Sequence, residues 1–572
     1  MKLRLSIINL KNIYILAAGT AALTVGSALA GTPETASLLI TAEPQGYGYI
    51  DLASATLIGT RTLREKIEVP ASTSSYTAND LAFSGAADFD DFTELEPLVS
   101  ASFDISAADP TVAYNSGGAG SYTIRGVGAS RVAVLIDGVR QPLEVDFQVG
   151  GIAINSAGRD YFDPAMFEAV EIFKGTASSL YGSDALAGVV AFKTPAPFDL
   201  VSSYSSDRFF GYRFQYGSAS DSFSHVVTGA FNEGALSGLV IYAKRDYGER
   251  ENQAKPVNGI LASPNPVSAQ SDSVLAKIDY ALTDTQRLEF AFEGFERSTD
   301  IDVQNIVQTD RFASTIALGA SLIASTRTDT TEAAMNQSER SRYRFSLKHV
   351  LQVSDADDDA ARLETLVYHQ RALTEDHLST RGTIENVANA SSSLSIASRS
   401  RSEVETHYEE ITTGLSSTYK GTVDHLWGTH RLLFGFESVF GSSELPFRSN
   451  GETVVTASNL SGFPDLTPGA VSNFDSNTPR LPSTDTLRAG LYAQDEFTFG
   501  DEAQWILVAG LRGDYYKLKS DKVAAFRAFV GTDAPDYSDF SISPSIALLH
   551  RLTDGSQRLC ILSARLSQPN TR

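Results

Sequence analysis

The chain of 572 residues carries 69 Asp plus Glu against 46 Lys plus Arg, a formal net charge of −23, and contains a single Cys. This acidic balance disfavours nucleic-acid binding, which needs a basic face, and the single Cys excludes a disulfide framework, a thiolate zinc cluster and a Cys-ligated iron–sulfur centre. A hydrophobic fraction of 42% excludes a helical membrane bundle, whereas 43 Gly, 31 Phe and 22 Tyr suit a large strand-rich protein.

Residues 1–30 have the pattern of a secretory signal peptide. Basic residues without any acidic one accompany a largely apolar run at 13–25, and Ala28 and Ala30 supply small side chains before a cleavage site. An N-terminal membrane anchor is the alternative, but the thirteen residues 13–25 would span only about 20 Å of helix against a bilayer core of about 30 Å. We therefore expect an exported protein.

Two regions with different composition follow. Residues 31–82 are small and polar without strong periodicity, which indicates an extended periplasmic arm. Residues 83–200 contain short apolar runs that end at Gly turns, and they predict a small α/β domain. Its strands are expected at 122–126, 131–139, 167–173 and 188–192.

From 205 to 555 the hydrophobic period is two. Tyr343, Phe345 and Leu347 alternate with Arg344 and Lys348, and charged residues at every second position need a wet face. The theme recurs at 237–246, 273–280, 287–297, 361–370, 430–438, 489–499 and 505–516. Such segments of about ten residues are typical of an outer-membrane β-barrel, although soluble sandwiches also alternate. No apolar run after residue 30 approaches the roughly 20 residues of a spanning helix.

Two long motifs lie in the compact domain. The first runs from Ile124 to Pro142 and the second from Asp163 to Val190. Together they resemble the plug domain of TonB-dependent outer-membrane receptors. The positions that carry the resemblance are Arg125, Gly126, Arg131, Asp137, Gly138, Glu171, Lys174, Gly175, Tyr181 and Gly182.

The residue types at these motif positions also have a physical explanation. The glycines stand at expected strand ends, where positive φ or close backbone approach is often needed. The charged residues lie within or beside apolar strands, so each needs a partner when buried. We favour a structural ion-pair cluster over direct substrate contact. The resemblance implies that such charges dock the plug to the barrel wall and release it when energy arrives from the inner membrane.

The resemblance further implies a small α/β plug inside an antiparallel transmembrane barrel of 22 strands in the cell outer membrane, contacted by lipid and driven by the TonB–ExbB–ExbD system. A short extended segment, the TonB box, should precede the plug and add a strand to TonB. The expected match is Ala55, Thr56, Leu57, Ile58, Gly59 and Thr60, where Thr and Ile favour strands. An ordinary linker is the alternative.

The barrel is similar to the haem/haemoglobin receptor branch, which implies haem or a haem protein as the transported ligand, with a ferric siderophore as the alternative. Haem iron is held axially by His, Tyr, Met or Cys. His377 and His407 bracket a Ser-rich segment that we expect to be a surface loop, so they are the candidate ligands. His349, His369 and His430 lie in alternating strands and are expected to be solvated lumen residues.

No intrinsic cofactor, metal site or enzyme activity is predicted, because the chain lacks a nucleophile elbow, a His-Glu-x-x-His motif and a Walker loop. At roughly 24 residues per strand, an estimate for strands with long outer loops, the barrel region would form about 15 strands. Residues 556–572 depart from the family pattern, so a frameshifted or truncated and non-functional receptor is one hypothesis. A passive porin or adhesin with a fixed plug is another.

Overall fold

The computed structural model describes residues 35–40, 55–56, 64–65, 72–78, 80, 93, 96–101, 121–128, 131–143, 145–149, 152–157, 159, 161–182, 184–204, 206–218, 220–249, 265–304, 307, 309–318, 321–353, 361–388, 395–459, 465, 467–477, 481–500, 504–551 and 557–563. The predicted signal peptide lies outside these ranges. No helix within them is long and apolar enough to cross a membrane.

The N-terminal part holds short elements. They are β1 (Thr35–Ile40), β2 (Ala55–Thr56), β3 (Arg64–Glu65), β4 (Ser72–Thr77), β5 (Val99–Ala101), β6 (Tyr122–Ile124), β7 (Val132–Ile136), β8 (Val139–Arg140), β9 (Val145–Val149), β10 (Ile152–Ala157), the 3-10 helix η5 (Pro164–Met166), β11 (Ala169–Lys174), α3 (Ser178–Tyr181), β12 (Gly188–Lys193) and α4 (Pro197–Ser202).

Long strands make up the rest of the chain. They are β13 (Arg208–Gly217), β14 (Ser222–Glu233), β15 (Leu236–Gly248), β16 (Val267–Thr283), β17 (Gln286–Asp302), β18 (Thr309–Leu318), β19 (Ser321–Gln352), β20 (Arg362–Ala388), β21 (Ser395–His425), β22 (Gly428–Leu445), β23 (Phe447–Ser458), β24 (Val471–Asn477), β25 (Leu481–Phe499), β26 (Trp505–Ser520), β27 (Tyr537–Arg551) and β28 (Gln557–Ser563), with α5 (Ala524–Val530) between β26 and β27.

The inner domain is built on a five-stranded sheet in the order β4-β11-β12-β7-β8, in which β12 runs parallel to β7. The run of Val, Leu and Ile in β7 is buried along its whole length, as expected for a strand covered on both faces. Val132, Val134 and Ile136 enter one hydrophobic cluster and Ala133 and Leu135 enter another. The strands and the Asp-Gly turn predicted for the plug are confirmed.

Both clusters continue from the plug into the surrounding wall. The first includes Leu239 and Leu275 of β15 and β16, and the second includes Leu433 and Tyr492 of β22 and β25. Burying one such aliphatic side chain stabilises by about 1.5–3 kcal/mol. Apolar contact on opposite sides therefore centres the plug inside the wall.

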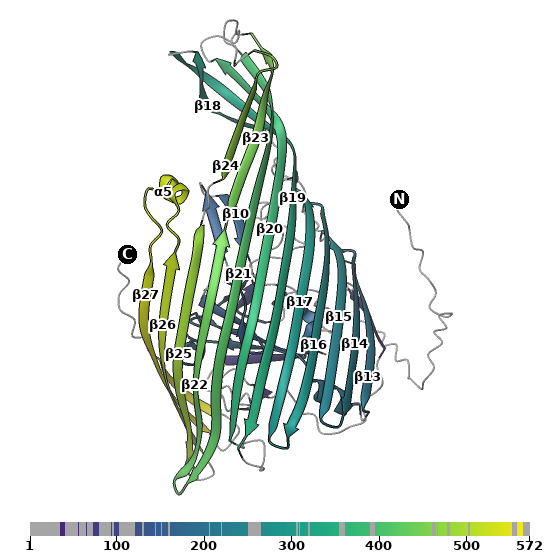
Figure 1. Ribbon diagram of the computed structural model, residues 1–572, viewed down its shortest axis with the longest axis vertical. Helices are drawn as coiled ribbons and strands as arrows, with labels where there is room; N and C mark the ends of the chain where they lie inside the picture. Colours follow the sequence, from purple (N-terminus) through teal and green to yellow (C-terminus); the bar gives the residue numbers. More distant parts are fainter. Residues whose placement is uncertain are drawn as a thin grey trace, which may run out of the picture.

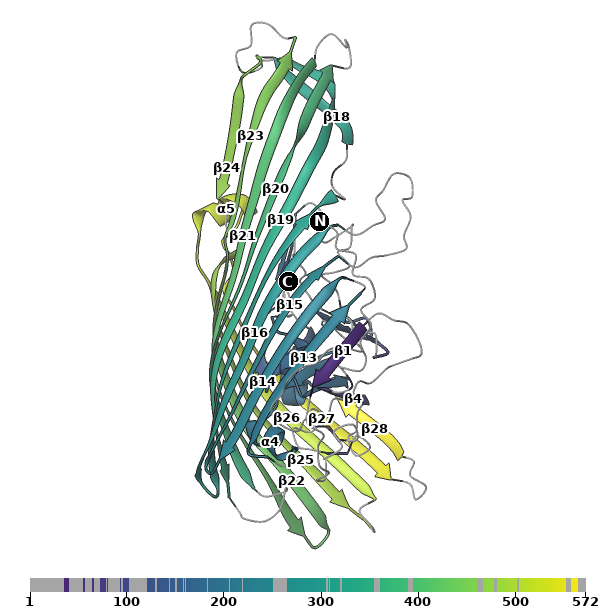
Figure 2. The same cartoon turned by 90° about the vertical axis from the view of Figure 1, so that its right-hand side faces the viewer.

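The wall is one antiparallel sheet of seventeen strands, β1 followed by β13 to β28, close to the expected number of about 15. Figures 1 and 2 show it curving around the plug, and β1 and β28 are its two edges among the described strands. Short turns, such as Leu426–Trp427, join strands at one end, and longer connections such as that with α5 stand at the other. This asymmetry is typical of periplasmic turns and extracellular loops.

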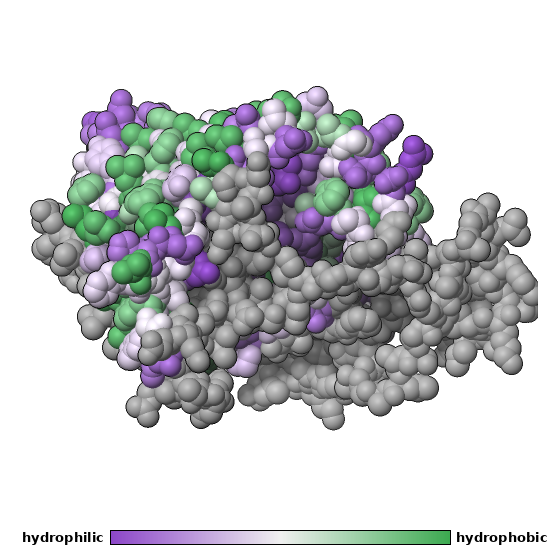
Figure 3. Space-filling model, turned by 90° about the horizontal axis from the view of Figure 1, so that it is seen from below, coloured by the Kyte–Doolittle hydropathy of each residue, from purple (hydrophilic) through white to green (hydrophobic). Residues whose placement is uncertain are grey.

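The strand alternation separates two faces of the wall. Arg344 is 1% exposed and faces the plug, whereas Phe345, next in sequence, is 49% exposed on the outer face. Figure 3 shows hydrophobic residues along the outer rim and hydrophilic residues within the hollow. The polar face that the alternating charged residues predicted is thus the lumen face of the wall. Its polar side chains contact the plug.

Aromatic rings gather on the outer face at the end of the wall that carries the short turns. His430 stacks on Phe497 with ring centroids 4.2 Å apart, Phe497 stacks on Phe499, and Trp505 stacks on His550 at 4.0 Å. Rings of this kind gather at the headgroup level of transmembrane barrels. They define the lower border of the apolar band.

A charge placed in this band should destabilise the folded protein. Leu491 is 70% exposed on the outer face, among other apolar side chains, and Leu491→Arg should cost about 2–4 kcal/mol in lipid. Leu426 is 96% exposed in a turn, so Leu426→Arg should change the free energy of unfolding by less than about 0.5 kcal/mol. Urea titration in lipid vesicles measures both, and equal effects would contradict an apolar band facing lipid.

Candidate functional site: charged contacts between plug and wall

The turn between β7 and β8 presents a carboxylate to the wall. Asp137 adopts a φ of 49° and Gly138 one of 81°, a left-handed pair that Asp and Gly tolerate. Thr194 donates to Asp137 through its backbone N at 3.0 Å and its hydroxyl at 2.5 Å. From the wall, Lys277 Nζ lies 3.4 Å and Arg344 Nη2 4.0 Å from Asp137 Oδ2.

These partners change the acidity of Asp137. Withdrawal from bulk water would raise its pKa, but the charges of Lys277 and Arg344 and the hydrogen bonds from Thr194 outweigh that effect and lower the pKa to about 2. The carboxylate is therefore ionised whenever the plug is in place. It forms an electrostatic link between the plug and two strands of the wall, β16 and β19.

Two neighbouring arginines of β19 extend this link. Arg344 Nη1 donates to the carbonyl of Ile136 at 2.7 Å, and Arg342 Nε donates to the carbonyl of Tyr161 at 3.0 Å. Both guanidinium groups also pair with Glu293 of β17. Glu293 and Asp137 together thus balance two buried positive charges that would otherwise be too costly in the lumen.

A second link is bidentate. Arg245 of β15 approaches Asp163 of the plug through Nε at 2.5 Å and Nη2 at 3.1 Å, and the side chains are 9% and 2% exposed. Asp163 Oδ1 also accepts from the backbone N of Ala165 at 2.7 Å and so caps η5. The planar fork of Arg matches a carboxylate in this way, which makes it a strong buried contact.

A third link lies beside α3. Arg140 and Asp184, both of the plug, pair at 2.5 Å, and Arg488 of β25 lies 3.4 Å from the same carboxylate oxygen. Burial would raise the pKa of Asp184, but Arg140 and Arg488 outweigh it, so the pKa is lowered. Glu437 of β22 lies 3.7 Å from Arg140, which completes an alternating chain of charges across the interface.

The end of α3 explains the Tyr181-Gly182 pair of the second motif. Gly182 has φ 86° and ψ −175°, a region that only Gly adopts readily. A Cβ there would lie 3.1 Å from Arg140 Nη2 and 3.3 Å from Arg512 Nη2. The bare backbone lets Arg512 of β26 donate to the carbonyl of Leu180 at 2.9 Å, while Tyr181 is buried next to it.

Lys174 binds within the plug instead of to the wall. Its Nζ pairs with Glu96 and donates to Ser74 Oγ at 3.0 Å, and Tyr76 Oη donates to Glu96 at 2.5 Å. Burial would raise the pKa of Glu96, but hydrogen bonds from Lys174 and Tyr76 lower it overall. This cluster fastens β4 to β11, so its position is that of a structural ion pair.

The remaining motif residues are dispersed. Glu171 is buried in β11, whereas Arg125, with φ 53°, and Arg131 are exposed and need no buried partner. Gly126 has the positive φ expected of it. The expectation is wrong for Gly175, whose φ is ordinary and where a Cβ would meet nothing nearer than Phe173 Cε1 at 3.4 Å.

The predicted TonB box lies only partly within the described residues. Ala55 and Thr56 form β2, which pairs antiparallel with β3 through Ala55↔Glu65 and Thr56↔Arg64. The other four residues of the predicted box, 57–60, lie outside the described ranges.

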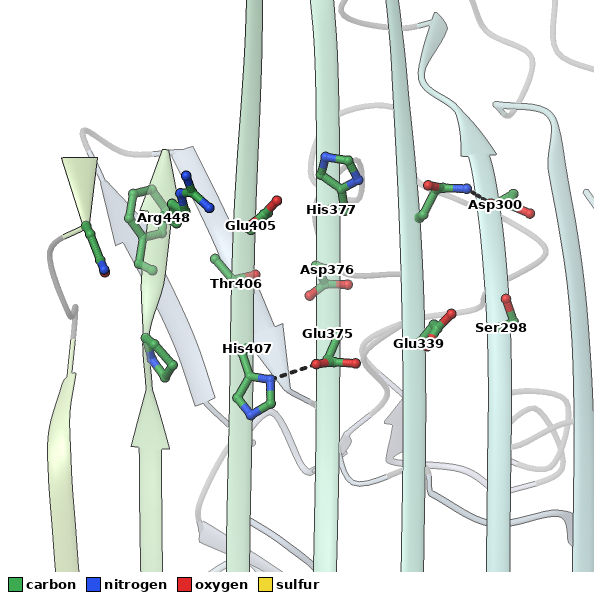
Figure 4. A pocket seen from close by; sticks show the side chains of 14 residues that line it. Ser298, Asp300, Glu339, Glu375, Asp376, His377, Glu405, Thr406, His407 and Arg448 are labelled. Carbon is green, nitrogen blue, oxygen red and sulfur yellow. Dashed lines mark hydrogen bonds and ion pairs between the residues drawn. The ribbon is translucent and has the colours of Figure 1, made fainter. Parts of the chain in front are cut away.

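His377 and His407 are brought together, but not in a loop. Most of the Ser-rich segment between them is strand, in β20 and β21, so the loop expectation is wrong there: strand pairing on both sides satisfies a polar backbone as well as water does. His377 pairs with Glu405 and His407 with Glu375 across these strands. Both histidines line a groove of about 550 Å³ (Figure 4).

The two histidines project away from the plug. In β20 and β21 the even-numbered side chains Thr374, Asp376 and Tyr408 are buried on the lumen face, so 377 and 407 fall on the outer face. The same holds for His349, His369 and His430, which are paired with outward neighbours. The expectation that these three line the lumen is wrong, because alternation alone does not say which parity faces inward.

Sequence reasoning missed the wall side of the interface. Arg342, Arg344, Arg245, Arg512 and Glu293 lie on β-strands whose sequence shows only that charged residues alternate with apolar ones. Each is 9% exposed or less. The available signal was Arg at every second position of 340–344, since an arginine ladder in a barrel needs an acidic or carbonyl partner inside.

Buried guanidinium groups of a β-sheet wall, paired with the carboxylates and carbonyls of an inner domain, define a β-barrel whose lumen is filled by a plug. Residues 65–189 match the family model described as TonB-dependent Receptor Plug Domain, and residues 277–567, half of the chain, match that described as TonB dependent receptor-like, beta-barrel. The chain belongs to the TonB-dependent receptor family and is a protein of the outer membrane.

Curated relatives match over shorter stretches. Transferrin-binding protein A of Haemophilus influenzae is 31% identical over 181 residues, which is 29% of this chain and 20% of the relative. The Hemin receptor of Yersinia pestis is 32% identical over 168 residues, 29% and 22% of the two chains. Hemoglobin-haptoglobin utilization protein B of Neisseria meningitidis is 29% identical over 235 residues, 34% and 28%. The matches thus span 20% to 28% of the length of these relatives.

Among solved structures, the siderophore receptor PiuA from Acinetobacter baumannii has a TM-score of 0.49 at 12% identity, over 86% of this chain and 64% of that chain.

The depressed pKa of Asp137 predicts a stability change in acid. Because the folded pKa of about 2 lies below the ordinary value of 3.8, the stabilisation is complete above about pH 4 and is lost as the pH falls through about 2. The difference corresponds to about 2 kcal/mol. Asp137→Asn should remove this part of the pH dependence, as measured by urea unfolding between pH 2 and 6, and an unchanged profile would contradict the link.

Gly182→Ala should loosen the plug. The φ and ψ of Gly182 cost any other residue about 1–3 kcal/mol, and the added methyl would press on Arg140 and Arg512. Gly175→Ala is the matched control, with an ordinary φ and no close neighbour. Protease sensitivity of the plug should rise several-fold in the first variant and stay at the parent level in the second; the reverse order would refute this account of α3.

Proposed function

We propose that this protein is a TonB-dependent outer-membrane receptor for energy-coupled uptake of an iron source. The observation that carries the proposal is the mode of plug attachment. Asp137, Asp163 and Asp184 each meet a cation of the wall, and these contacts are separate from the hydrophobic clusters. A lumen closed by such contacts holds back solutes until force is applied.

The energetics favour an external driving force. Breaking a buried ion pair while leaving its partner in place costs about 3–5 kcal/mol, and Arg245 with Asp163 alone is of this kind. Several such contacts would keep spontaneous release rare. TonB, powered through ExbB and ExbD, would supply the work by pulling on the arm that contains residues 55–60.

For the ligand, we propose haem or a haem protein. The relatives include proteins named for haemin and for haemoglobin with haptoglobin, and one named for transferrin, another iron carrier. Since His377 and His407 project from the outer face, haem iron in the lumen would need another axial donor, and a tyrosine oxygen is a suitable one. Tyr161 and Tyr408 lie on the lumen side, where their hydroxyls are hydrogen-bonded to Thr374 and Glu410 while the plug is in place. A ferric siderophore is the second candidate.

Deleting residues 55–60 tests energy coupling. The deletion should abolish uptake of radiolabelled iron by cells that depend on this receptor, because TonB loses its attachment, while ligand binding to the cell surface stays within about twofold of the parent. Deleting the same number of residues from 41–46 is the control and should preserve uptake. Uptake that survives the first deletion would favour a passive porin or adhesin.

A spectral titration of the purified protein separates the ligands. Haem bound through a lumen donor should give the same absorption spectrum and affinity in the parent and in the His377→Ala/His407→Ala variant. Loss of the haem spectrum in that variant would instead make the two histidines the ligands. Saturable binding of a ferric siderophore without any haem spectrum would select the second candidate.

A further inference from the structure

The outer face of β20, β21 and β22 carries a cluster that the proposed uptake does not use. His407 and Glu409 of β21 and Glu444 of β22 each offer a ligand atom, and these three atoms lie within 4.8 Å of one another. The side chains are half-buried. On β22 the cluster stands beyond Phe440, whose side chain is 60% exposed, on the side away from the periplasmic turns.

The charges of this cluster are unbalanced. Glu409 and Glu444 are direct cross-strand partners, and like charges in that position destabilise a sheet. Arg371 of β20 pairs with Glu409. Glu444 receives only a hydroxyl, that of Ser483 at 3.3 Å, and no Lys or Arg of the described strands forms an ion pair with it. A cation between the two carboxylates would remove the repulsion.

His407 is already oriented as a metal ligand would be. Glu375 Oε1 lies 2.8 Å from His407 Nδ1 (Figure 4). A carboxylate at Nδ1 keeps the proton on that nitrogen and leaves the lone pair on Nε2. This carboxylate–histidine arrangement is the usual outer shell of a metal-bound imidazole, where it fixes both the tautomer and the ring orientation.

We propose that His407, Glu409 and Glu444 bind a divalent transition-metal ion of the zinc class, with Glu375 as the positioning residue. One imidazole nitrogen and two carboxylate oxygens are donors that Zn²⁺ accepts at about 2.0–2.2 Å, and small rotamer changes would close the cluster to those distances. The fourth position is open to water or to a donor from outside. The ion would clamp β21 to β22 on the extracellular side of the apolar band.

Metal binding to the full chain, purified in detergent without a polyhistidine tag and stripped with chelator, tests this proposal. Zn²⁺ titration should show one tight site, and Co²⁺ should give ligand-field absorption bands at the same stoichiometry. His407→Ala should weaken binding at least 100-fold, and Glu375→Gln about 10- to 100-fold. His369→Ala is the matched control, since His369 also projects from the outer face of the wall, on β20, where it contacts Thr413. This variant should bind Zn²⁺ like the parent.

The repulsion between Glu409 and Glu444 gives a second, independent test, in which the unfolding temperature is measured with and without metal. Without metal, Glu444→Gln should unfold at a higher temperature than the parent, because the repulsion is gone while the Arg371–Glu409 ion pair is kept; with Zn²⁺ the parent should gain stability and the variant should not. Tight binding retained by His407→Ala, equal loss in His369→Ala, or a Zn²⁺ response of Glu444→Gln equal to that of the parent would each overturn the proposal.

Discussion

The architecture depends on how the lumen accommodates positive charge. Arginines on lumen-facing strand positions are taken out of water, and burial of an unpaired guanidinium is too costly for a stable protein. Three of them have acceptors on the plug: Arg344 the carbonyl of Ile136, Arg245 the carboxylate of Asp163, and Arg512 the carbonyl of Leu180. The plug thus fills the lumen and also supplies the hydrogen-bond acceptors and negative charges that the arginines of the wall need. Without the plug, these arginines would lack those partners.

This division of roles separates two kinds of contact. The hydrophobic clusters around Leu275 and Leu433 centre the plug and are not directional, so a small displacement changes them gradually. The hydrogen bonds within the ion pairs are directional and short-ranged, and they are lost over a movement of a few ångström. Under the proposed pull on the arm, the resistance would be greatest at the start of the movement, when these hydrogen bonds break.

Local features of the fold could be predicted from the sequence. The Val- and Ile-rich β7 and the Asp137-Gly138 turn follow from short-range preferences, and alternation in 342–350 predicted a wall with one wet face. Partner identity could not be predicted, because Arg344 and Ile136 are 208 positions apart and no local rule pairs them. The face on which each histidine lies could not be predicted for the same reason. His349 and His369 lie in alternating strands as expected, but only the position of the plug defines which face of a strand points inward.

The strands β19, β20 and β21 are 32, 27 and 31 residues long, and Figure 1 shows them rising beyond the rest of the wall. At about 3.3 Å per residue, β20 is about 90 Å long, and even tilted by 45° it would climb about 60 Å, twice the hydrocarbon thickness. About half of it would thus extend beyond the hydrocarbon core as a hydrogen-bonded ribbon. Such a rigid β-ribbon would lose little conformational entropy when it binds a partner. It can therefore present a fixed surface to a bulky macromolecule at a distance from the lipid headgroups.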